Sequence, residues 1–255
     1  MKNFAIGSVA LLAVGLAGPA ALAADMPARP LPPPIVVANW TGCYVGFSIG
    51  ESWGRSRHEA VAGTTAIRGG VPVTLAAGTS IADSFNLSGM IGGAQAGCNY
   101  QVGAWVFGLE GDWSVTNKEG QAIENQQFPL WYGSTKERWV ATARGRIGYA
   151  VTDKWLWYVT GGGAWAKFDI NSTLFNVANS VNNFSQANTR GGWTVGAGTE
   201  YALGYGWSIK SEFLYVDFGT FTTFTSGAIS PNVFAPRDVK VNDYIFRFGM
   251  NYKFL

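Results

Sequence analysis

Nine charged side chains recur at alternate positions within segments whose remaining positions are largely apolar. Acids and bases placed in this way could transfer protons as carboxylate pairs, or neutralise one another as ion pairs. Glu110 and Asp112 on one segment are followed by Arg144 and Arg146 on the next. We predict structural pairing, with ion gating as a minor role, because a buried unpaired charge is costly. The full set is Glu110, Asp112, Arg144, Arg146, Glu200, Lys210, Glu212, Arg247 and Lys253.

Hydrolytic chemistry would generally need a histidine that activates a serine or a water molecule, and this chain has a single histidine, His58. It falls in a long connecting segment, and Glu59 is only its neighbour in sequence. We therefore predict a solvated loop histidine and no enzyme active site.

The elements that must position the charged residues are eight segments of alternating character, each roughly ten residues long, which is the length a tilted strand needs to cross a bilayer. Short turns (102–103, 151–154 and 203–206) alternate with long connections (54–87, 115–136, 168–190 and 219–241). This pattern predicts an all-β, eight-stranded, antiparallel up-and-down transmembrane β-barrel with short periplasmic turns and four long extracellular loops. The segments are 40–53, 88–101, 104–114, 137–150, 155–167, 191–202, 207–218 and 242–255.

The two faces of these segments could be arranged in two ways. In a soluble barrel the charges would face water and the aromatic residues would fill the cavity. In a membrane barrel the aromatic face meets lipid, and Trp and Tyr gather near the strand ends, as they do here. The opposite face is rich in Gly and small polar residues, which suits a narrow lumen shared with charged side chains. We predict that the aromatic face is outside.

The N-terminus predicts export. Residues 1–23 combine Lys2, an apolar run and Ala21-Leu22-Ala23, which is typical of a cleaved signal peptide. Residues 24–39 are rich in proline and predict an extended periplasmic tail, so that the barrel occupies residues 40–255. Cleavage removes Lys2 and no acid, so the net charge falls from +2 to +1, which argues against nucleic acid as a partner.

Two cysteines, Cys43 and Cys98, fall on the predicted lipid face near the periplasmic ends of adjacent strands. Because the periplasm is oxidising, they could form a cross-strand disulfide, but they could equally be two separate small apolar residues. Their spacing does not match a zinc site, so we expect no metal.

At this point the chain resembles the small alphaproteobacterial outer-membrane β-barrel family of porin-like surface antigens. The motifs that carry this resemblance are Trp40-Thr-Gly-Cys-Tyr-Val-Gly46, Gly92-Gly-Ala-Gln-Ala-Gly97, Val106-Phe-Gly-Leu-Glu-Gly-Asp112, Arg144-Gly-Arg-Ile-Gly-Tyr149, Gly192-Trp-Thr-Val-Gly-Ala-Gly198 and Tyr215-Val-Asp-Phe-Gly219.

The resemblance implies a location in the outer membrane of a Gram-negative bacterium and roles in envelope integrity and surface exposure. Some members bind haem, which makes His58 a possible haem ligand. Such barrels usually end on an aromatic residue that the barrel-assembly machinery reads. Here Phe254 fits that register, although Leu255 follows it. The predicted assembly signal is Phe248, Met250, Tyr252 and Phe254.

We therefore predict a structural and surface-interaction barrel whose lumen is plugged by charged pairs. A small-solute porin and a haem-binding surface protein are the alternatives; eight strands leave little room for a water channel. The expected partners are outer-membrane lipid and lipopolysaccharide, the barrel-assembly machinery and periplasmic chaperones. We expect a monomer without a cofactor.

Overall fold

The computed structural model describes residues 39–68, 71–123, 131–175, 181–224 and 236–254. The predicted signal peptide and nearly all of the predicted proline-rich tail lie outside the described residues. No helix in the described part of the chain is long and apolar enough to cross a membrane. The described strands are β1 (Gly42–Ala60), β2 (Thr65–Arg68), β3 (Val71–Thr74), β4 (Ser80–Val102), β5 (Trp105–Thr116), β6 (Glu119–Ile123), β7 (Trp131–Thr152), β8 (Trp155–Phe175), β9 (Val181–Gly204), β10 (Trp207–Thr223) and β11 (Arg237–Lys253).

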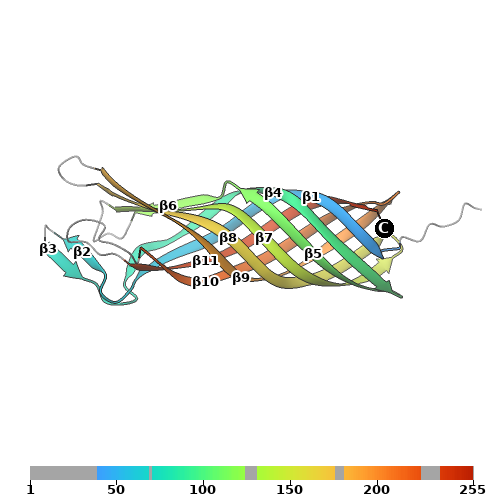
Figure 1. The fold of residues 1–255 in the computed structure, drawn as a ribbon, viewed down its shortest axis with the longest axis horizontal. Coiled ribbons are helices and arrows are strands. Elements are labelled where there is room, and N and C mark those ends of the chain that lie inside the picture. Colours follow the sequence, from blue (N-terminus) through green and yellow to red (C-terminus); the bar gives the residue numbers. More distant parts are fainter. Residues whose placement is uncertain (1–38, 69–70, 124–130, 176–180, 225–235, 255) are drawn as a thin grey trace, which may run out of the picture. The chain divides into compact units, whose positions relative to one another are not determined.

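Eight of these strands form a closed antiparallel ring in the order β1-β11-β10-β9-β8-β7-β5-β4, and β4 pairs again with β1 (Figure 1). The strand pairing can be followed once around the ring from Trp53. The path passes through Tyr244, Tyr215, Val195, Gly161, Gly145, Leu109 and Cys98 and returns to β1 at Cys43, ten residues from its start. A shear of ten on eight strands corresponds to a strand tilt of about 40° and a backbone radius of about 8 Å.

The alternation of side chains sorts the residues as predicted. On β10, for example, Phe213 is exposed, whereas its neighbours Glu212 and Leu214 are buried in the barrel. Large exposed apolar residues cover the outward face of all eight ring strands, and the buried polar and charged residues line the inside. The aromatic face is therefore outside, and the structure confirms the predicted transmembrane barrel.

The membrane-spanning part can be measured on β1. Ten residues separate Cys43 from Trp53, and at a 40° tilt they rise about 25 Å, the height of the apolar band of outer-membrane barrels. Glu51 is an exposed carboxylate within this band. Beyond Trp53 the strand continues for seven residues to Ala60.

The three short connections are confirmed as tight turns between β4 and β5, β7 and β8, and β9 and β10. The last of them includes Tyr205 and Gly206, both with positive φ (53° and 83°). The predicted long loops were only partly correct, because much of each segment forms strand. The ring strands extend beyond the band, β2 and β3 form a separate hairpin, and β6 pairs with β7. Outside lipid both faces of a strand can be polar, so the alternation that marks membrane strands disappears while the backbone pairing continues.

Candidate functional site in the barrel interior

Arg144 and Arg247 are at the centre of a charge cluster inside the barrel. Arg144 donates to Glu110 at 2.6 Å, to Asp112 at 3.0 Å and to Glu212 at 3.0 Å. Arg247 donates to Asp112 at 2.9 Å and to Glu212 at 2.7 Å. Two guanidinium groups thus hold three carboxylates from β5 and β10, because a planar guanidinium presents several donors in a fixed geometry.

A second set of contacts extends the cluster toward the periplasmic end. Arg146 donates to Glu200 at 3.0 Å and lies over the rings of Tyr44 and Tyr158. Lys210 donates to Glu110 at 2.8 Å, and the Tyr44 hydroxyl donates to the same carboxylate at 2.6 Å. Charge-assisted hydrogen bonds of this kind are the stronger ones.

The cluster is electrically balanced. Four acids (Glu110, Asp112, Glu200 and Glu212) meet four bases (Arg144, Arg146, Lys210 and Arg247), and every one of them is buried. We call these eight residues the charge network. Lys253 was predicted to belong to the same set, and that prediction is wrong. Its Nζ lies at the periplasmic rim and donates to the backbone carbonyls of Asn39 and Thr41, because β11 reaches the end of the barrel there.

Glycine makes room for most of the charge network. A Cβ on Gly162 would lie 2.8 Å from the Arg144 Cα, and one on Gly50 would lie 2.6 Å from the Arg247 Cα. Six of the eight network residues have a glycine directly across a strand pair, so a narrow lumen can hold long side chains. The pairs are Glu110–Gly97, Arg144–Gly162, Arg146–Gly108, Lys210–Gly249, Glu212–Gly198 and Arg247–Gly50.

Apolar layers lie on both sides of the charge network. Trp40, Val106, Leu156 and Tyr158 pack together toward the periplasmic end. A larger buried cluster fills the extracellular side: Ile91, Val140, Ala164, Ala166, Phe168, Ile170, Leu214, Val216, Phe218, Phe221, Phe224, Val239, Val241 and Ile245.

A second ionic group, which the sequence did not predict, lies near the level of Trp53. Lys118 Nζ is 2.7 Å from Glu137 and 2.5 Å from Asp243, and it donates to Ser52 at 3.1 Å; both ion pairs are fully buried. Asp243 has the same parity as Arg247 on β11, a signal that could have found it. Lys118 was hidden because it follows the end of β5 in a predicted loop.

His58 is on strand β1 and not in a loop, so the prediction of a solvated histidine was wrong. Its side chain is fully buried five residues beyond Trp53, with Nε2 3.1 Å from the Ser56 hydroxyl and 3.3 Å from that of Thr135. Burial, and then the charge of Arg237, lowers the pKa of His58 to about 3. Nδ1 has no hydrogen-bond partner among the described residues. A haem iron needs an accessible imidazole nitrogen, and the residues around His58 do not fit that group.

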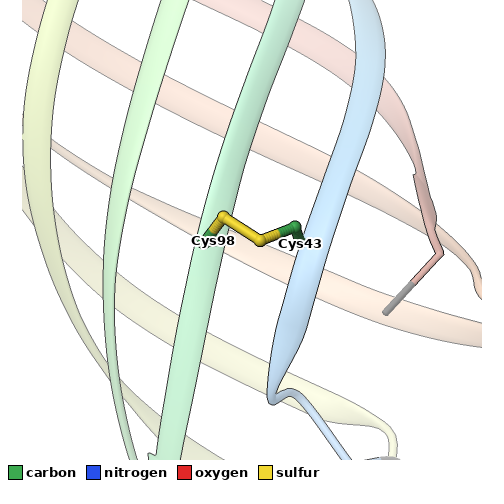
Figure 2. Close-up of a disulfide and its surroundings, with 2 residues drawn as sticks. All are labelled: Cys43 and Cys98. Carbon is green, nitrogen blue, oxygen red and sulfur yellow. A yellow bond between two sulfur atoms is a disulfide. The ribbon is translucent and has the colours of Figure 1, made fainter.

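Cys43 and Cys98 are joined by a disulfide that crosses from β1 to β4 (Figure 2). The two residues are direct register partners near the periplasmic ends of their strands. Of the two interpretations left open by the sequence, the structure contains the bonded one. Within the described residues no cysteine is free, and no group of three or more His, Cys, Asp or Glu side chains could hold a metal ion.

The residues of the predicted assembly signal lie on the outward face of β11 and just beyond it. Phe248, Tyr252 and Phe254 are exposed, and Met250 is half-buried. The Phe254 amide donates to the Cys43 carbonyl at 3.0 Å, so the last described residue still pairs beside β1, where the ring closes.

The profile of the family described as "Outer membrane protein beta-barrel domain" matches residues 8–254, nearly the whole chain. The chain belongs to the outer-membrane β-barrel family. This outer-membrane barrel is 32% identical over 265 residues to the 31 kDa outer-membrane immunogenic protein of Brucella melitensis, with all of both chains covered. It is 27% identical over 263 residues to the 25 kDa outer-membrane immunogenic protein of the same species, covering 100% and 99% of the two chains.

Among solved structures, the outer membrane protein OprG from Pseudomonas aeruginosa matches with 12% identity and a TM-score of 0.42, over 85% of this chain and 99% of that one. Family and relatives together place this barrel in the outer membrane of a Gram-negative bacterium and in an alphaproteobacterial group of surface barrels.

Proposed function

We propose that this barrel is a structural and surface-interaction protein of the outer membrane, with a closed lumen, that contributes to envelope integrity and is not an enzyme. The observation that carries the closed lumen is the neutral, fully buried charge network between two apolar layers. An ion or solute would have to break several charge-assisted hydrogen bonds and then cross an apolar layer that offers it no partners.

Single-channel conductance tests directly whether the lumen of the barrel is closed. Refolded protein, with folding checked by heat-modifiable gel mobility, is added to planar bilayers beside a sixteen-stranded porin as a positive control. We expect no stepwise current from this barrel. Discrete, reproducible openings from the wild-type protein would instead support the small-solute porin.

Surface exposure is supported by the length of the strands and by the relatives, whose names record them as immunogenic outer-membrane proteins. β8 and β9 run 21 and 24 residues, about twice the span of the membrane band, so they carry the chain well beyond the lipid. Antibodies raised against the refolded barrel should bind intact cells.

A role in envelope integrity predicts that a deletion strain becomes more sensitive to detergent and to large antibiotics, and that the wild-type gene restores resistance.

We also propose that the barrel-assembly machinery recognises the outward residues at the end of β11. Phe254→Ala should slow assembly into proteoliposomes that contain that machinery while leaving spontaneous refolding in detergent unchanged. Phe246→Ala is the matched control, because Phe246 has the same outward orientation in mid-strand. Equal slowing by both variants would contradict this role for the terminal aromatic residue.

A further inference from the structure

Three basic side chains stand on the outer face of β1 and β11, immediately beyond the membrane band. Arg55 and Arg57 follow Trp53 by two and four residues, and Lys240 lies four residues beyond Tyr244. All three are exposed. Four residues along a strand tilted by 40° rise about 10 Å, which places this basic row (Arg55, Arg57 and Lys240) at the depth of the outer-leaflet headgroups.

Among the side chains that the structure describes, few carboxylates neutralise the basic row. Arg57 and Lys240 face each other directly across the strand pair, an arrangement that is unfavourable for like charges. Within the described residues neither Arg55 nor Lys240 has an ion-pair partner, and the Arg55 contact with the Asn86 amide oxygen is long, at 3.4 Å. Arg57 alone approaches a carboxylate, that of Glu59 at 3.6 Å.

Two basic residues on β7, on the same side of the membrane, differ in this respect. On β7, Lys136 pairs with Glu119 at 3.3 Å and Arg138 pairs with Asp169 at 2.6 Å. Together these two cations carry the same charge as Arg55 and Lys240, but each is already paired with a carboxylate of the protein. They therefore serve as an internal control for the row on β1 and β11.

Acidic residues that the structure describes lie on both sides of the basic row along the strands, but they do not pair with Arg55 or Lys240. Beyond it, Glu59 faces Asp238 across the strand pair, and Asp238 accepts from Thr222 at 2.6 Å. On the membrane side, Glu51 is four residues from Arg55, about 13 Å along the strand. The row therefore lies between Glu51 on the membrane side and Glu59 with Asp238 beyond it, and Asp217 is the register partner of Asn242 on β10.

An aromatic ledge lies on the membrane side of the basic row. The ring of Trp53 is 6.2 Å from that of Phe213 and 6.4 Å from that of Tyr244, and Tyr244 is 5.2 Å from Tyr215. Asn86 and Asn242 are the register partners of Arg55 on its two neighbouring strands and supply polar amides. Flat aromatic rings therefore lie on the lipid side of a level that carries both amides and basic side chains.

We propose that this surface binds the phosphorylated glycolipid of the outer leaflet. Arg55 and Lys240 contact its phosphates, Asn86 and Asn242 face its sugar hydroxyls, and the aromatic ledge packs against the start of its acyl chains. Guanidinium groups match phosphate geometry, and each basic residue near an anionic membrane surface adds measurably to the affinity. The proposal rests on the outer-membrane location and not on the closed lumen, so its failure would leave the conductance result intact.

The experiment measures binding of bis-phosphorylated lipid A to the full barrel in neutral detergent micelles, by native mass spectrometry. The variant is Arg55→Ala with Lys240→Ala, and the matched control is Lys136→Ala with Arg138→Ala, which removes the same charge. We expect the first double variant to bind about tenfold to thirtyfold more weakly, and the control to stay within about threefold of the wild type. All proteins must retain heat-modifiable mobility, which surface substitutions should preserve.

A second arm uses dephosphorylated lipid A. The wild type should bind it as weakly as the first double variant does, and the difference between the proteins should vanish. The proposal would be overturned if the two double variants bound lipid A equally weakly, or if the first double variant bound it as tightly as the wild type. It would also be overturned if the wild type bound phosphorylated and dephosphorylated lipid A equally well.

Discussion

Arg144 is the side chain whose removal should damage the interior most, because it contacts three carboxylates in a fully buried site. Arg144→Ala leaves the charge network with four acids and three bases. Removing one partner of a buried ion pair typically costs about 3–5 kcal/mol, since the remaining charge is stranded. We expect the free energy of unfolding in detergent, measured with urea or guanidinium, to fall by about that amount.

Arg138→Ala provides the comparison for this prediction. Arg138 also donates to a carboxylate, that of Asp169 at 2.6 Å, but its side chain is 53% exposed. Exposed ion pairs contribute about 0–1 kcal/mol, so this variant should unfold close to the wild type. Similar losses in the two variants would mean that burial of the charge network adds little to its energetic importance.

His58 should make the stability of the barrel depend on pH. Its pKa is lowered by burial to about 3, whereas in the unfolded chain it is near 6.5. Below pH 6.5 the unfolded chain therefore binds a proton that the folded barrel does not, and stability falls as the pH falls. Between pH 7 and pH 5 this contributes a loss of about 2 kcal/mol.

Unfolding free energies of the wild type and of His58→Gln at the two pH values check this prediction. The difference between the proteins isolates the histidine from the carboxylates, which titrate in both. The variant should lose less stability than the wild type on acidification. A loss of the same size in both proteins would show that His58 is solvated or already charged in the folded state.

At the scale of elements, the disulfide between Cys43 and Cys98 joins β1 to β4 across a separation of 55 residues. In the chain-entropy model a link of that length stabilises the fold by about 4 kcal/mol, because it restricts the unfolded chain. The double variant Cys43→Ser, Cys98→Ser should still form a barrel, since all backbone pairings remain, but unfold at a lower urea concentration. A reducing agent should shift the wild type toward the variant and leave the variant unchanged.

The sequence predicts the elements well where lipid imposes a pattern and poorly where it does not. Alternation along one strand was enough to place Trp105, Phe107 and Leu109 on the outside. The antiparallel pairing of adjacent strands was enough to place Glu110 beside Arg144. The contacts of Arg247 with Asp112, and of Lys210 with Glu110, cross the lumen and depend on the shear of the closed ring. Shear is a property of all eight pairings together, so no single segment reveals it. The burial of His58 was missed because it lies beyond the band, where a strand has no lipid-facing side, and Lys118 was missed because it follows the end of β5 in a predicted loop.

At the scale of the whole molecule, the barrel consists of a lipid-facing cylinder and an extension of the same strands into water. The aromatic belt at Trp53 separates the two parts. Below it the outward side chains are apolar apart from Glu51 and a few small polar residues; above it they include Arg55, Arg57 and Lys240. The interior changes along the same axis, from the charge network to apolar packing and then to the buried group around His58. The same continuous sheet is therefore exposed to lipid on one part of its outer face and to water on the other.

Spin labels along β1 can locate the boundary between those solvents. Both native cysteines are disulfide-bonded, so a single introduced cysteine can be labelled in the refolded barrel. Labels on Phe47→Cys and Ile49→Cys should be accessible to dissolved oxygen, which concentrates in lipid, and labels on Arg57→Cys and Glu59→Cys to a water-soluble nickel complex. A label on Ser48→Cys, which points inward and is buried, should be shielded from both reagents. If the Ser48 label reached oxygen while the Phe47 label did not, the faces would be reversed; if the Arg57 label lay in lipid, the band would be taller than about 25 Å and the basic row would lie below the headgroups.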